Sequence, residues 1–551
     1  MTSWTEEVDF VVIGSGAGSF CAGLALRDLG KSVLVLEKTE LVGGSTAMSG
    51  GVLWVPNHPL QARAGVPDSP EQARAYLDAA VGDNGGPGSS PARRDAFLKT
   101  GPQLISYLEG KGMPFRRSEG WSDYYDELPG GSARGRSLSM ELFDTRELGE
   151  WAGRLRGGGR NMPIRWPETR LLMLAKRTPA GVFAAIRLAA RIAIMKLRGQ
   201  KLVGMGTAIQ GRMLKAALAA GVDVRPNSPV TSLVEEGGRV VGVTVDHDGA
   251  ALKIRARLGV LINAGGFARN AEMRKQYGPQ PSSTEWTHSN PGETGEALRY
   301  AMDLGAATDQ LDQAVWLVTS LPPGGGRDFH VFDISKPHII LVDGQGRRFT
   351  NESGSYMENG QQMYRNHAVP AWAIFESRHR NRYPWGTSTP PGITPDKYFS
   401  EGYMKRAGTL DELAQACELD PAVLRQTVER FNGFAKSGKD LDFKRGDRAY
   451  DRGWGDPTVK PNPCLGAIER GPFYAVKVYP GDVGTFGGLV TDEHARVLRA
   501  DGGAIEGLYA TGNCTASVMG ACYPGAGASI SASFVFGYLA ARHAAHATAN
   551  V

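Results

Sequence analysis

The sequence predicts an α/β fold in which one parallel-sheet domain is assembled from distant segments and carries an inserted α+β domain. Three observations predict it. Near the N-terminus a short apolar run, Val8 to Ile13, leads directly into a glycine-rich turn. Two further apolar runs, Leu258 to Ala264 and Gly507 to Asn513, also end at glycines far along the chain. Mixed turn-rich and helical segments separate these runs, so the parallel-sheet domain is predicted to be discontinuous.

Length and composition limit the classes of protein to which the chain can belong. Its 551 residues leave room for two to four domains, at roughly 100 to 200 residues each. Lys and Arg (62) exceed Asp and Glu (57) by only 5, which gives no reason to expect a nucleic acid partner. Glycine makes up 73 of the 551 residues, well above its ordinary share of about 7%. This excess predicts many left-handed turns or close backbone approaches, as around a large buried ligand.

The cysteine, histidine and N-terminal patterns exclude several kinds of site. The 5 cysteines are scattered and form no CxxC pair, so neither a disulfide framework, a zinc site nor c-type haem attachment is predicted. The 10 histidines show no HxxxH or HExxH spacing, and we predict no metal. Acidic residues, rather than basic ones, precede the first apolar run, which is not the pattern of a signal peptide. We expect a cytoplasmic protein.

The first element is a βαβ unit. Val8 to Ile13 reads as a buried strand, Phe20 to Leu29 as the following helix, and Ser32 to Leu36 as the second strand. The glycines of the turn between Ile13 and the helix permit backbone amides to approach a pyrophosphate at the helix N-terminus. Glu37, at the end of the second strand, can accept hydrogen bonds from ribose hydroxyls, which makes NADP the least expected dinucleotide. A glycine-rich turn without a ligand is the alternative, since Ser19 occupies the third glycine position of the motif.

Later elements complete this domain and define the insert. A second glycine cluster spans 43–51, and Val230 to Val245 reads as a β-hairpin that turns at two glycines. FAD proteins with a discontinuous domain use strands such as those ending near 264 and 513 to bring the chain back beneath the flavin. We therefore predict a Rossmann-like FAD-binding domain at 1–285 and 455–551, with an inserted α+β catalytic domain at 286–454. The residues predicted to contact the cofactor are Gly14, Gly16, Ala17, Gly18, Glu37, Lys38, Gly44, Ser45, Thr46, Ser49, Gly50, Gly51, Ala264, Gly265, Gly512, Asn513, Ala528 and Ile530.

One basic segment stands apart. From Arg170 to Lys201 there is no Asp or Glu, and basic residues accumulate around apolar ones. On a helix, Arg187, Arg191 and Arg198 share one face, with the bulky apolar side chains largely elsewhere. The segment is too short and too charged to span a bilayer, but it could lie on the anionic cytoplasmic face of a membrane as a peripheral contact. The alternative interpretation is an ordinary surface helix with a solvated basic face.

Six stretches carry a resemblance to a known family. They are GSGAGSFCAGLAL, LEKTELVGGSTAMSGG, GRRFTNESGSY, GTFGGLVTD, LYATGNCTASVMG and YPGAGASI. They resemble the bacterial 3-ketosteroid Δ1-dehydrogenases, FAD enzymes within a wider group that includes soluble fumarate reductases, and the likeness runs nearly end to end. It implies non-covalently bound FAD, a 3-ketosteroid substrate, and an electron acceptor, a quinone or another compound, that the sequence does not identify.

The resemblance also implies roles for four residues. Family members remove a proton from the carbon beside a ring ketone and a hydride from the next carbon. By motif match, the Tyr523 hydroxyl and the Gly527 backbone N–H would hold the carbonyl oxygen, and Tyr356 would be the base. Tyr124 would assist Tyr356, since a tyrosine of pKa about 10 is a poor base alone; its neighbour Tyr125 is the alternative.

Other functions stay open from the sequence. The nearest is a 3-ketosteroid Δ4-(5α)-dehydrogenase, which desaturates the neighbouring bond. The second is a fumarate-reductase-like enzyme with an arginine acid in Arg347–Arg348, although that pair also fits a structural role and Tyr523 occupies the C-terminal position. The third is a flavin-binding sensor or carrier without catalysis, which does not explain a full set of acid–base tyrosines.

Overall fold

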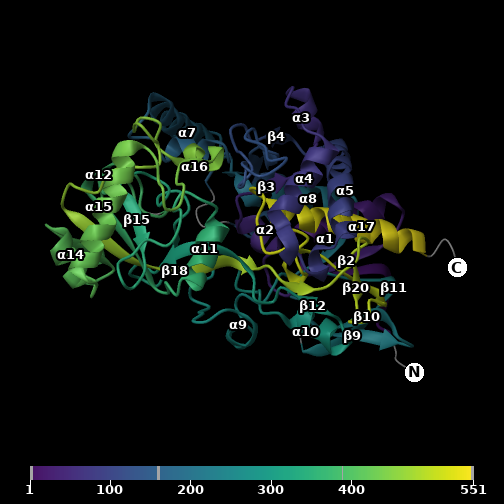
Figure 1. Ribbon diagram of the computed structural model, residues 1–551. Coiled ribbons are helices and arrows are strands. Elements are labelled where there is room, and N and C mark those ends of the chain that lie inside the picture. Colours follow the sequence, from purple (N-terminus) through teal and green to yellow (C-terminus); the bar gives the residue numbers. More distant parts are fainter. Residues whose placement is uncertain (1–3, 158–161, 248, 388, 548–551) are drawn as a thin grey trace.

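The computed structural model describes residues 4–157, 162–247, 249–387 and 389–547. Its elements gather into two lobes (Figure 1). Segments from the beginning and the end of the chain lie together in one lobe, and the middle of the chain forms most of the other. The predicted discontinuity of the first domain is therefore confirmed.

An eight-stranded mixed sheet forms the core of the first lobe. Its strands are β1 (Glu6–Ile13), β2 (Val33–Leu36), β8 (Asp223–Arg225), β9 (Val230–Glu236), β10 (Arg239–His247), β11 (Ala250–Ile262), β20 (Arg496–Leu498) and β21 (Ala504–Ala510). β1 pairs in parallel with both β2 and β11, and β11 pairs in parallel with β21. The three apolar runs that predicted the domain thus lie side by side. β9 and β10 form the predicted hairpin, in which Gly237 and Gly238 both have positive φ.

Two long helices cover this sheet and touch through glycines. α1 (Ala17–Asp28) follows β1, and α17 (Ala528–Ala547) runs beside it in the middle of the lobe (Figure 1). A Cβ atom at Gly18 would lie 2.5 Å from the Ser533 carbonyl oxygen, and one at Gly537 would lie 2.5 Å from the Gly18 carbonyl oxygen. These glycines let the two helices approach closely enough to bury an apolar layer that includes Phe10, Phe20 and Phe534.

The second lobe is built on an antiparallel sheet, as expected for an α+β domain. Its strands are β13 (Ala314–Ser320), β14 (Asp328–Phe329), β15 (Ile339–Val342), β16 (Ala371–Glu376), β17 (Met404–Ala407) and β18 (Phe473–Thr485). Its helices are α11 (Tyr356–Arg365), α12 (Ser377–Arg382), α13 (Asp396–Ser400), α14 (Leu410–Ala416), α15 (Pro421–Ser437) and α16 (Ala449–Trp454). β18 pairs with β13, β16 and β17, so this sheet extends past the predicted boundary at 454.

The remaining elements link the lobes and complete the first one. The strands are β3 (Val52–Trp54), β4 (Phe115–Arg117), β5 (Ser137–Met140), β6 (Phe143–Asp144), β7 (Leu202–Val203), β12 (Thr308–Asp309) and β19 (Gly488–Leu489). The helices are α2 (Gly44–Met48), α3 (Pro59–Arg63), α4 (Pro70–Val81), α5 (Pro91–Gly110), α8 (Met205–Ala219), α9 (Ala271–Tyr277) and α10 (Glu296–Asp303). Turns of 3₁₀ helix lie at Gly82–Asn84, Pro87–Ser89, Thr145–Gly153 and Gly512–Cys514.

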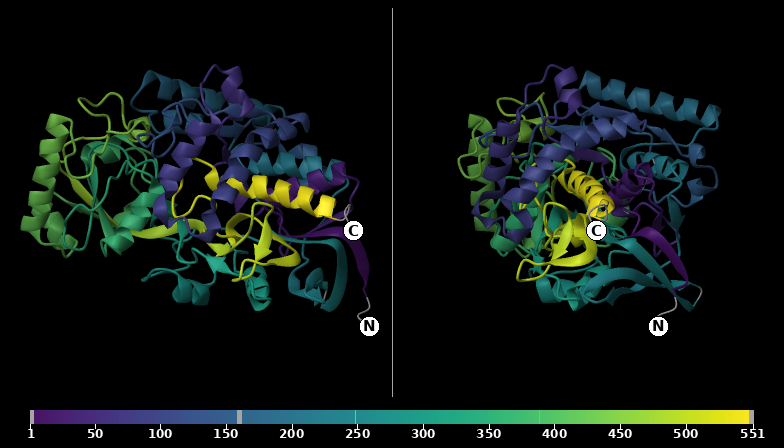
Figure 2. Two further views of the ribbon diagram at one scale, coloured as in Figure 1. Left: turned by 45° about the vertical axis from the view of Figure 1, so that its right-hand side comes forward. Right: turned by 90° about the vertical axis from the view of Figure 1, so that its right-hand side faces the viewer.

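The basic segment forms two helices, and the orientation of the longer one differs from the prediction. α6 (Glu168–Leu172) ends before Thr178, whose side chain caps α7 (Pro179–Leu197) at a proline. α7 runs along the upper edge of the molecule (Figures 1 and 2). Arg191, predicted on an outward basic face, turns inward and forms ion pairs with Glu168 at 2.6 Å. Among the described residues, no helix combines the length and apolar composition needed to cross a bilayer.

Candidate active site

A cavity of about 650 Å³ is lined by residues of both lobes. One end is formed by the glycine-rich turn after β1, the 43–51 cluster and the ends of β11 and β21. The other end is aromatic. Most residues predicted to contact a cofactor line the first end, namely Gly14, Gly16, Glu37, Lys38, Gly44, Ser45, Thr46, Ser49, Gly50, Gly51, Ala264, Gly265, Gly512, Asn513 and Ile530.

Three residues predicted to contact the cofactor do not line the cavity. Ala17 and Gly18 lie in the first turn of α1, and Ala528 begins α17; all three are buried. The backbone N–H of Gly18 donates to the Ser533 hydroxyl at 3.1 Å, so this glycine serves the contact between the two helices. Close packing of a helix is one role of the glycines in such motifs, and here Gly18 has it beside Ser19 at the third glycine position.

The cofactor end fits an anionic dinucleotide. α1 begins after Gly16 and has no acidic residue in its first turn, so its free N–H groups and positive dipole end are available to a phosphate. Gly44 lies beside this turn, since its Cβ atom would be 3.7 Å from the Gly16 Cα. Glu37 is held ready at the end of β2, because its carboxylate accepts a hydrogen bond from the Ser15 hydroxyl at 2.6 Å and from the Thr39 N–H at 3.0 Å.

Several polar residues at this end escaped sequence reasoning. Ser15 lies in the predicted glycine-rich turn and Asn263 in a predicted strand, but only their neighbours were predicted to contact the cofactor. Asn290 and Glu293 carry no motif. Burial raises the pKa of the Glu293 carboxyl to about 7, and its Oε2 is buried without a hydrogen-bond partner in the described part of the chain. An unpaired oxygen in the cavity wall is free to bind a polar group of a bound cofactor.

Tyrosines from four distant segments cluster at the aromatic end, where Tyr124, Tyr356 and Tyr523 line the cavity and Tyr450 does not. Tyr356 is the first residue of α11, Tyr523 precedes α17, Tyr124 lies before β5, and Tyr450 lies on α16. The ring centroid of Tyr124 lies 5.5 Å from that of Tyr356, 5.8 Å from that of Tyr523 and 4.5 Å from that of Tyr450. Tyr356 and Tyr523 are 5.7 Å apart. The three predicted tyrosines are thus brought together, whereas Tyr450 carried no sequence signal.

The structure distinguishes Tyr124 from Tyr125. Tyr124 lines the cavity beside Tyr356, whereas Tyr125 is buried behind it, with its ring 5.6 Å from the Arg448 guanidinium. The buried carboxylate of Asp123 fixes this segment, because it accepts hydrogen bonds from Trp54 Nε1 at 2.9 Å and Arg136 Nη1 at 2.7 Å. A tyrosine that directly follows such an anchor is held in a defined direction.

Burial dominates the acidity of these tyrosines. It raises the pKa of Tyr124 and Tyr356 well above the usual value of 10, and like-charge repulsion from neighbouring tyrosines raises it further. A side-chain hydrogen bond from Tyr356 and the nearby Arg170 guanidinium oppose this effect on the pKa of Tyr124. At most one ionised phenol can therefore be accommodated easily, and its charge would be shared across the cluster.

Gly527 lies next to the Tyr523 hydroxyl. It has φ of +94°, and a Cβ atom there would lie 2.1 Å from the Val52 carbonyl oxygen, so β3 excludes any side chain. The Tyr523 hydroxyl lies 3.0 Å from Ser529 Oγ, and the Gly527 N–H lowers the pKa of Tyr523 against the effect of burial. A hydroxyl and a backbone N–H thus lie side by side, an arrangement that can bind a carbonyl oxygen.

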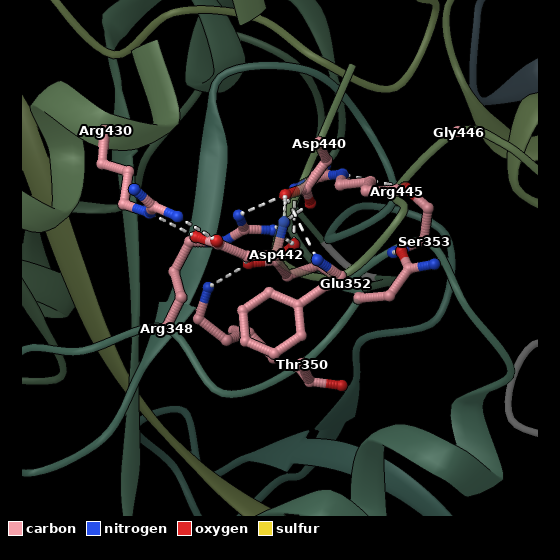
Figure 3. A network of polar contacts seen from close by, with 12 residues as sticks. Arg348, Thr350, Glu352, Ser353, Arg430, Asp440, Asp442, Arg445 and Gly446 are labelled. Carbon is pink, nitrogen blue, oxygen red and sulfur yellow. Dashed lines mark hydrogen bonds and ion pairs between the residues drawn. The ribbon is translucent and has the colours of Figure 1, made fainter. Parts of the chain in front are cut away.

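A buried ion-pair network supports the loop before Tyr356 (Figure 3). Glu352 accepts hydrogen bonds from Arg348 and Arg445, each at 2.9 Å, and Arg348 also pairs with Asp440 at 2.9 Å. Arg445 donates to the Ser353 hydroxyl at 3.0 Å, three residues before Tyr356. Neither Arg347 nor Arg348 lines the cavity. Arg348 thus pairs with two buried carboxylates, those of Glu352 and Asp440. This supports a structural role for Arg348 over a role as an acid.

Known proteins match this chain over nearly its whole length. The family model described as FAD binding domain matches residues 9–530. The 3-oxosteroid 1-dehydrogenase of Mycolicibacterium smegmatis is 41% identical, over 97% of this chain and 97% of its own. The structure of 3-ketosteroid Δ1-dehydrogenase from Sterolibacterium denitrificans in complex with 1,4-androstadiene-3,17-dione is similar with a TM-score of 0.93 and 38% identity, over 98% of this chain and 100% of that chain. The 3-ketosteroid Δ4-(5α)-dehydrogenase of Rhodococcus jostii shares the fold, with a TM-score of 0.70 and 22% identity over 99% of this chain and 98% of that chain.

Proposed function

The chain belongs to the FAD-dependent 3-oxosteroid 1-dehydrogenases, and from this premise we propose that it introduces a double bond between C1 and C2 in ring A of 3-ketosteroids. It is an oxidoreductase whose cofactor is FAD. The observation that carries the proposal is the tyrosine cluster, with Tyr124, Tyr356 and Tyr523 in mutual ring contact at the aromatic end of the cavity.

The chain's own residues supply the proton chemistry. FAD, when bound by the glycine-rich end, supplies the acceptor for the hydride that leaves C1. The Tyr523 hydroxyl and the Gly527 N–H bind the C3 carbonyl oxygen and stabilise the negative charge that develops there. Tyr356 accepts the proton from C2, with Tyr124 as the partner that shares or relays its proton. Loss of a proton from C2 and a hydride from C1 leaves the C1–C2 double bond.

The walls of the aromatic end suit an apolar ring system. Trp166, Phe329, Phe332 and Trp454 line the cavity together with the tyrosines. Arg348, the candidate arginine acid of a dicarboxylate enzyme, lies outside the cavity wall and pairs with Glu352 and Asp440. The identity to a Δ1-dehydrogenase (38%) exceeds that to the Δ4-(5α)-enzyme (22%), which favours the C1–C2 bond over the neighbouring one.

Two substrates test the bond position. A 4-ene-3-ketosteroid, incubated with an artificial electron acceptor, is expected to yield the 1,4-diene-3-one by mass spectrometry and NMR. A saturated 5α-3-ketosteroid is expected to yield the 1-ene product. Formation of a 4-ene from the saturated steroid, without turnover of the 4-ene substrate, would assign the chain to the Δ4-(5α) reaction.

We also propose that α7 binds an anionic phospholipid surface. Its apolar face, Val182, Phe183, Ile186, Ile194 and Leu197, is turned outward, and Phe183, Ile186 and Leu197 are 60%, 60% and 88% exposed. Contiguous exposed apolar side chains commonly mark an interaction surface. Basic side chains on and after α7, without any Asp or Glu from 170 to 201, complement an anionic lipid head group.

Position relative to the cavity also supports lipid as the occupant. Trp166, just before α6, lines the cavity, and α6 packs against α7. A membrane-bound α7 would therefore hold the aromatic end close to a bilayer in which a steroid dissolves.

Vesicle sedimentation tests this surface. Phe183→Ser/Ile186→Ser/Leu197→Ser should weaken binding to vesicles of phosphatidylglycerol and phosphatidylcholine by at least about tenfold, since each apolar side chain contributes on the order of 1.5 kcal/mol or more when buried. The control is Ile393→Ser/Leu441→Ser, which removes exposed apolar side chains from elsewhere (62% and 75% exposed). Equal binding of the triple variant and the wild type, or a wild-type dimer that the triple variant breaks, would overturn the lipid assignment.

A further inference from the structure

Arg170 is half-buried, and in the described part of the chain its guanidinium has no carboxylate partner. It lies on α6, and its Cζ is 4.1 Å from the ring centroid of Trp121 and 4.6 Å from that of Trp454. Its Nη1 donates to the Gly120 carbonyl. Within the described residues, its Nε and Nη2 are buried without any hydrogen-bond partner. Burying a charge in this state is costly unless something nearby requires it.

A glycine on α16 leaves space for the guanidinium of Arg170. A Cβ atom at Gly453 would lie 2.9 Å from Arg170 Nη2 and 3.0 Å from its Cζ, so only glycine fits this position of α16 without a shift. Trp121 and Trp454, which enclose the charge, are themselves in edge contact, with ring centroids 4.8 Å apart. The cation is therefore held at a specific place rather than left at the end of a mobile side chain.

The two tryptophans that enclose Arg170 connect it to the tyrosines. Trp121 and Tyr124 belong to one segment, and Tyr450 and Trp454 to one helix, so the aromatic pair around the cation continues directly into the tyrosine cluster. Burial raises the pKa of both Tyr124 and Tyr450, and the charge of Arg170 opposes this rise at each of them. Burial also lowers the pKa of Arg170 itself to about 10. The other ionisable groups around these rings are Tyr523, Glu358, Asp451 and the buried Lys336.

We propose that Arg170 is a positioning residue for the proton transfer, whose unpaired charge stabilises the negative charge that Tyr124 and Tyr356 share after one proton has left them. The inference rests on the proposed function, in which Tyr356 is the base. One phenol proton leaves the pair to solvent before the steroid reacts. The resulting phenolate takes the C2 proton and becomes a neutral phenol, while the negative charge moves to the steroid oxygen at Tyr523 and Gly527.

The pH dependence of kcat/KM tests this role. Activity rises with pH as the base loses its proton, and loss of a nearby cation raises the pKa of that step. Arg170→Met should therefore move the acidic limb to higher pH by about one unit, a loss of about tenfold at a fixed pH below the limb. Arg170→Lys, which keeps the charge, should restore most of the wild-type profile.

Matched variants separate charge from packing. Arg425→Met removes the same charge from α15, where the side chain is 48% exposed and 2.6 Å from Asp411, and should leave the limb unchanged. Lys336→Met reports the contribution of the buried lysine. If Arg170→Met fails to retain FAD, Gly453→Ala, which crowds the guanidinium, should give a smaller shift in the same direction.

The outcomes are distinct from those for the proposed function. Failure of the wild type to convert a 4-ene-3-ketosteroid would remove the proposed function itself. With an active wild type, an acidic limb of Arg170→Met within about 0.3 unit of the wild type, or equal impairment of the Met and Lys variants at an unchanged limb, would overturn the role of the charge.

Discussion

The two ends of the cavity are built in different ways. The cofactor end uses backbone turns and small residues, many of them in two neighbouring stretches, 14–16 and 44–51, with the ends of β11 and β21 beside them. The aromatic end uses large side chains from segments around Tyr124, Tyr356, Tyr450 and Tyr523, which are far apart in the sequence. Binding a dinucleotide needs close backbone approach, whereas moving a proton needs side chains of tuned acidity. A change at one end should therefore spare the function of the other.

The largest effect is expected at the aromatic end. Tyr356→Phe removes the base but keeps the ring, so kcat should fall by about 100-fold or more, as for loss of a general base. FAD should remain bound, with an unchanged visible spectrum. Tyr125→Phe, behind the cavity, is the matched control and should keep near-wild-type kcat. Substantial activity in Tyr356→Phe would remove this tyrosine from the role of base.

At the cofactor end, a substitution is expected to weaken the binding of FAD rather than the proton transfer. Gly14→Ala places a Cβ atom 2.4 Å from the Asn263 carbonyl oxygen in a residue with φ of +92°, so it should destabilise the protein by about 1–3 kcal/mol and weaken FAD retention. Gly237→Ala is the control, because it shares a positive φ (+60°) but has nothing within 4 Å. FAD content after gel filtration and thermal melting measure both. Full FAD retention by Gly14→Ala would show that this turn tolerates a side chain and would contradict the proposed difference between the two ends of the cavity.

A smaller effect is expected from Glu293 in the wall of the cofactor end. Its pKa is raised from 4.5 to about 7, so its neutral form is favoured in the folded state. The stabilisation is complete below about pH 4.5 and is lost as the pH rises through about 7. Glu293→Gln cannot ionise. Its free energy of unfolding relative to that of the wild type should therefore rise by roughly 1 to 3 kcal/mol as the pH is raised from 5 to 8. Melting curves of both holoenzymes at the two pH values test this. A difference between variant and wild type that is the same at both pH values would contradict the assigned pKa.

Local patterns predicted the first lobe well. β1, α1 and β2 were predicted because an apolar run, a glycine turn and an amphipathic helix follow one another within 30 residues. Two later strands, each ending at a glycine, were also predicted to belong to this domain, and β11 and β21 do so by pairing in parallel.

Features that depend on distant partners were not predicted in the same way. The boundary at 454 separated β18 from its own sheet, because pairing between strands so far apart in the sequence, such as Thr319 with Tyr479, leaves no periodic signal. The outward turn of the apolar face of α7 follows from the ion pairs between Arg191 and Glu168, which lies outside the segment considered. Tyr450 and Arg170 matched no motif, and only their contacts with Tyr124, Trp121 and Trp454 reveal them.

The most direct test of C1–C2 dehydrogenation is a single anaerobic turnover followed by the visible absorbance of the bound flavin. Addition of a 4-ene-3-ketosteroid to the purified holoenzyme should bleach the oxidised-flavin band, with one equivalent of 1,4-diene-3-one recovered per flavin reduced. A holoenzyme that stays yellow with this substrate would contradict the proposed reaction while leaving the FAD-binding lobe intact.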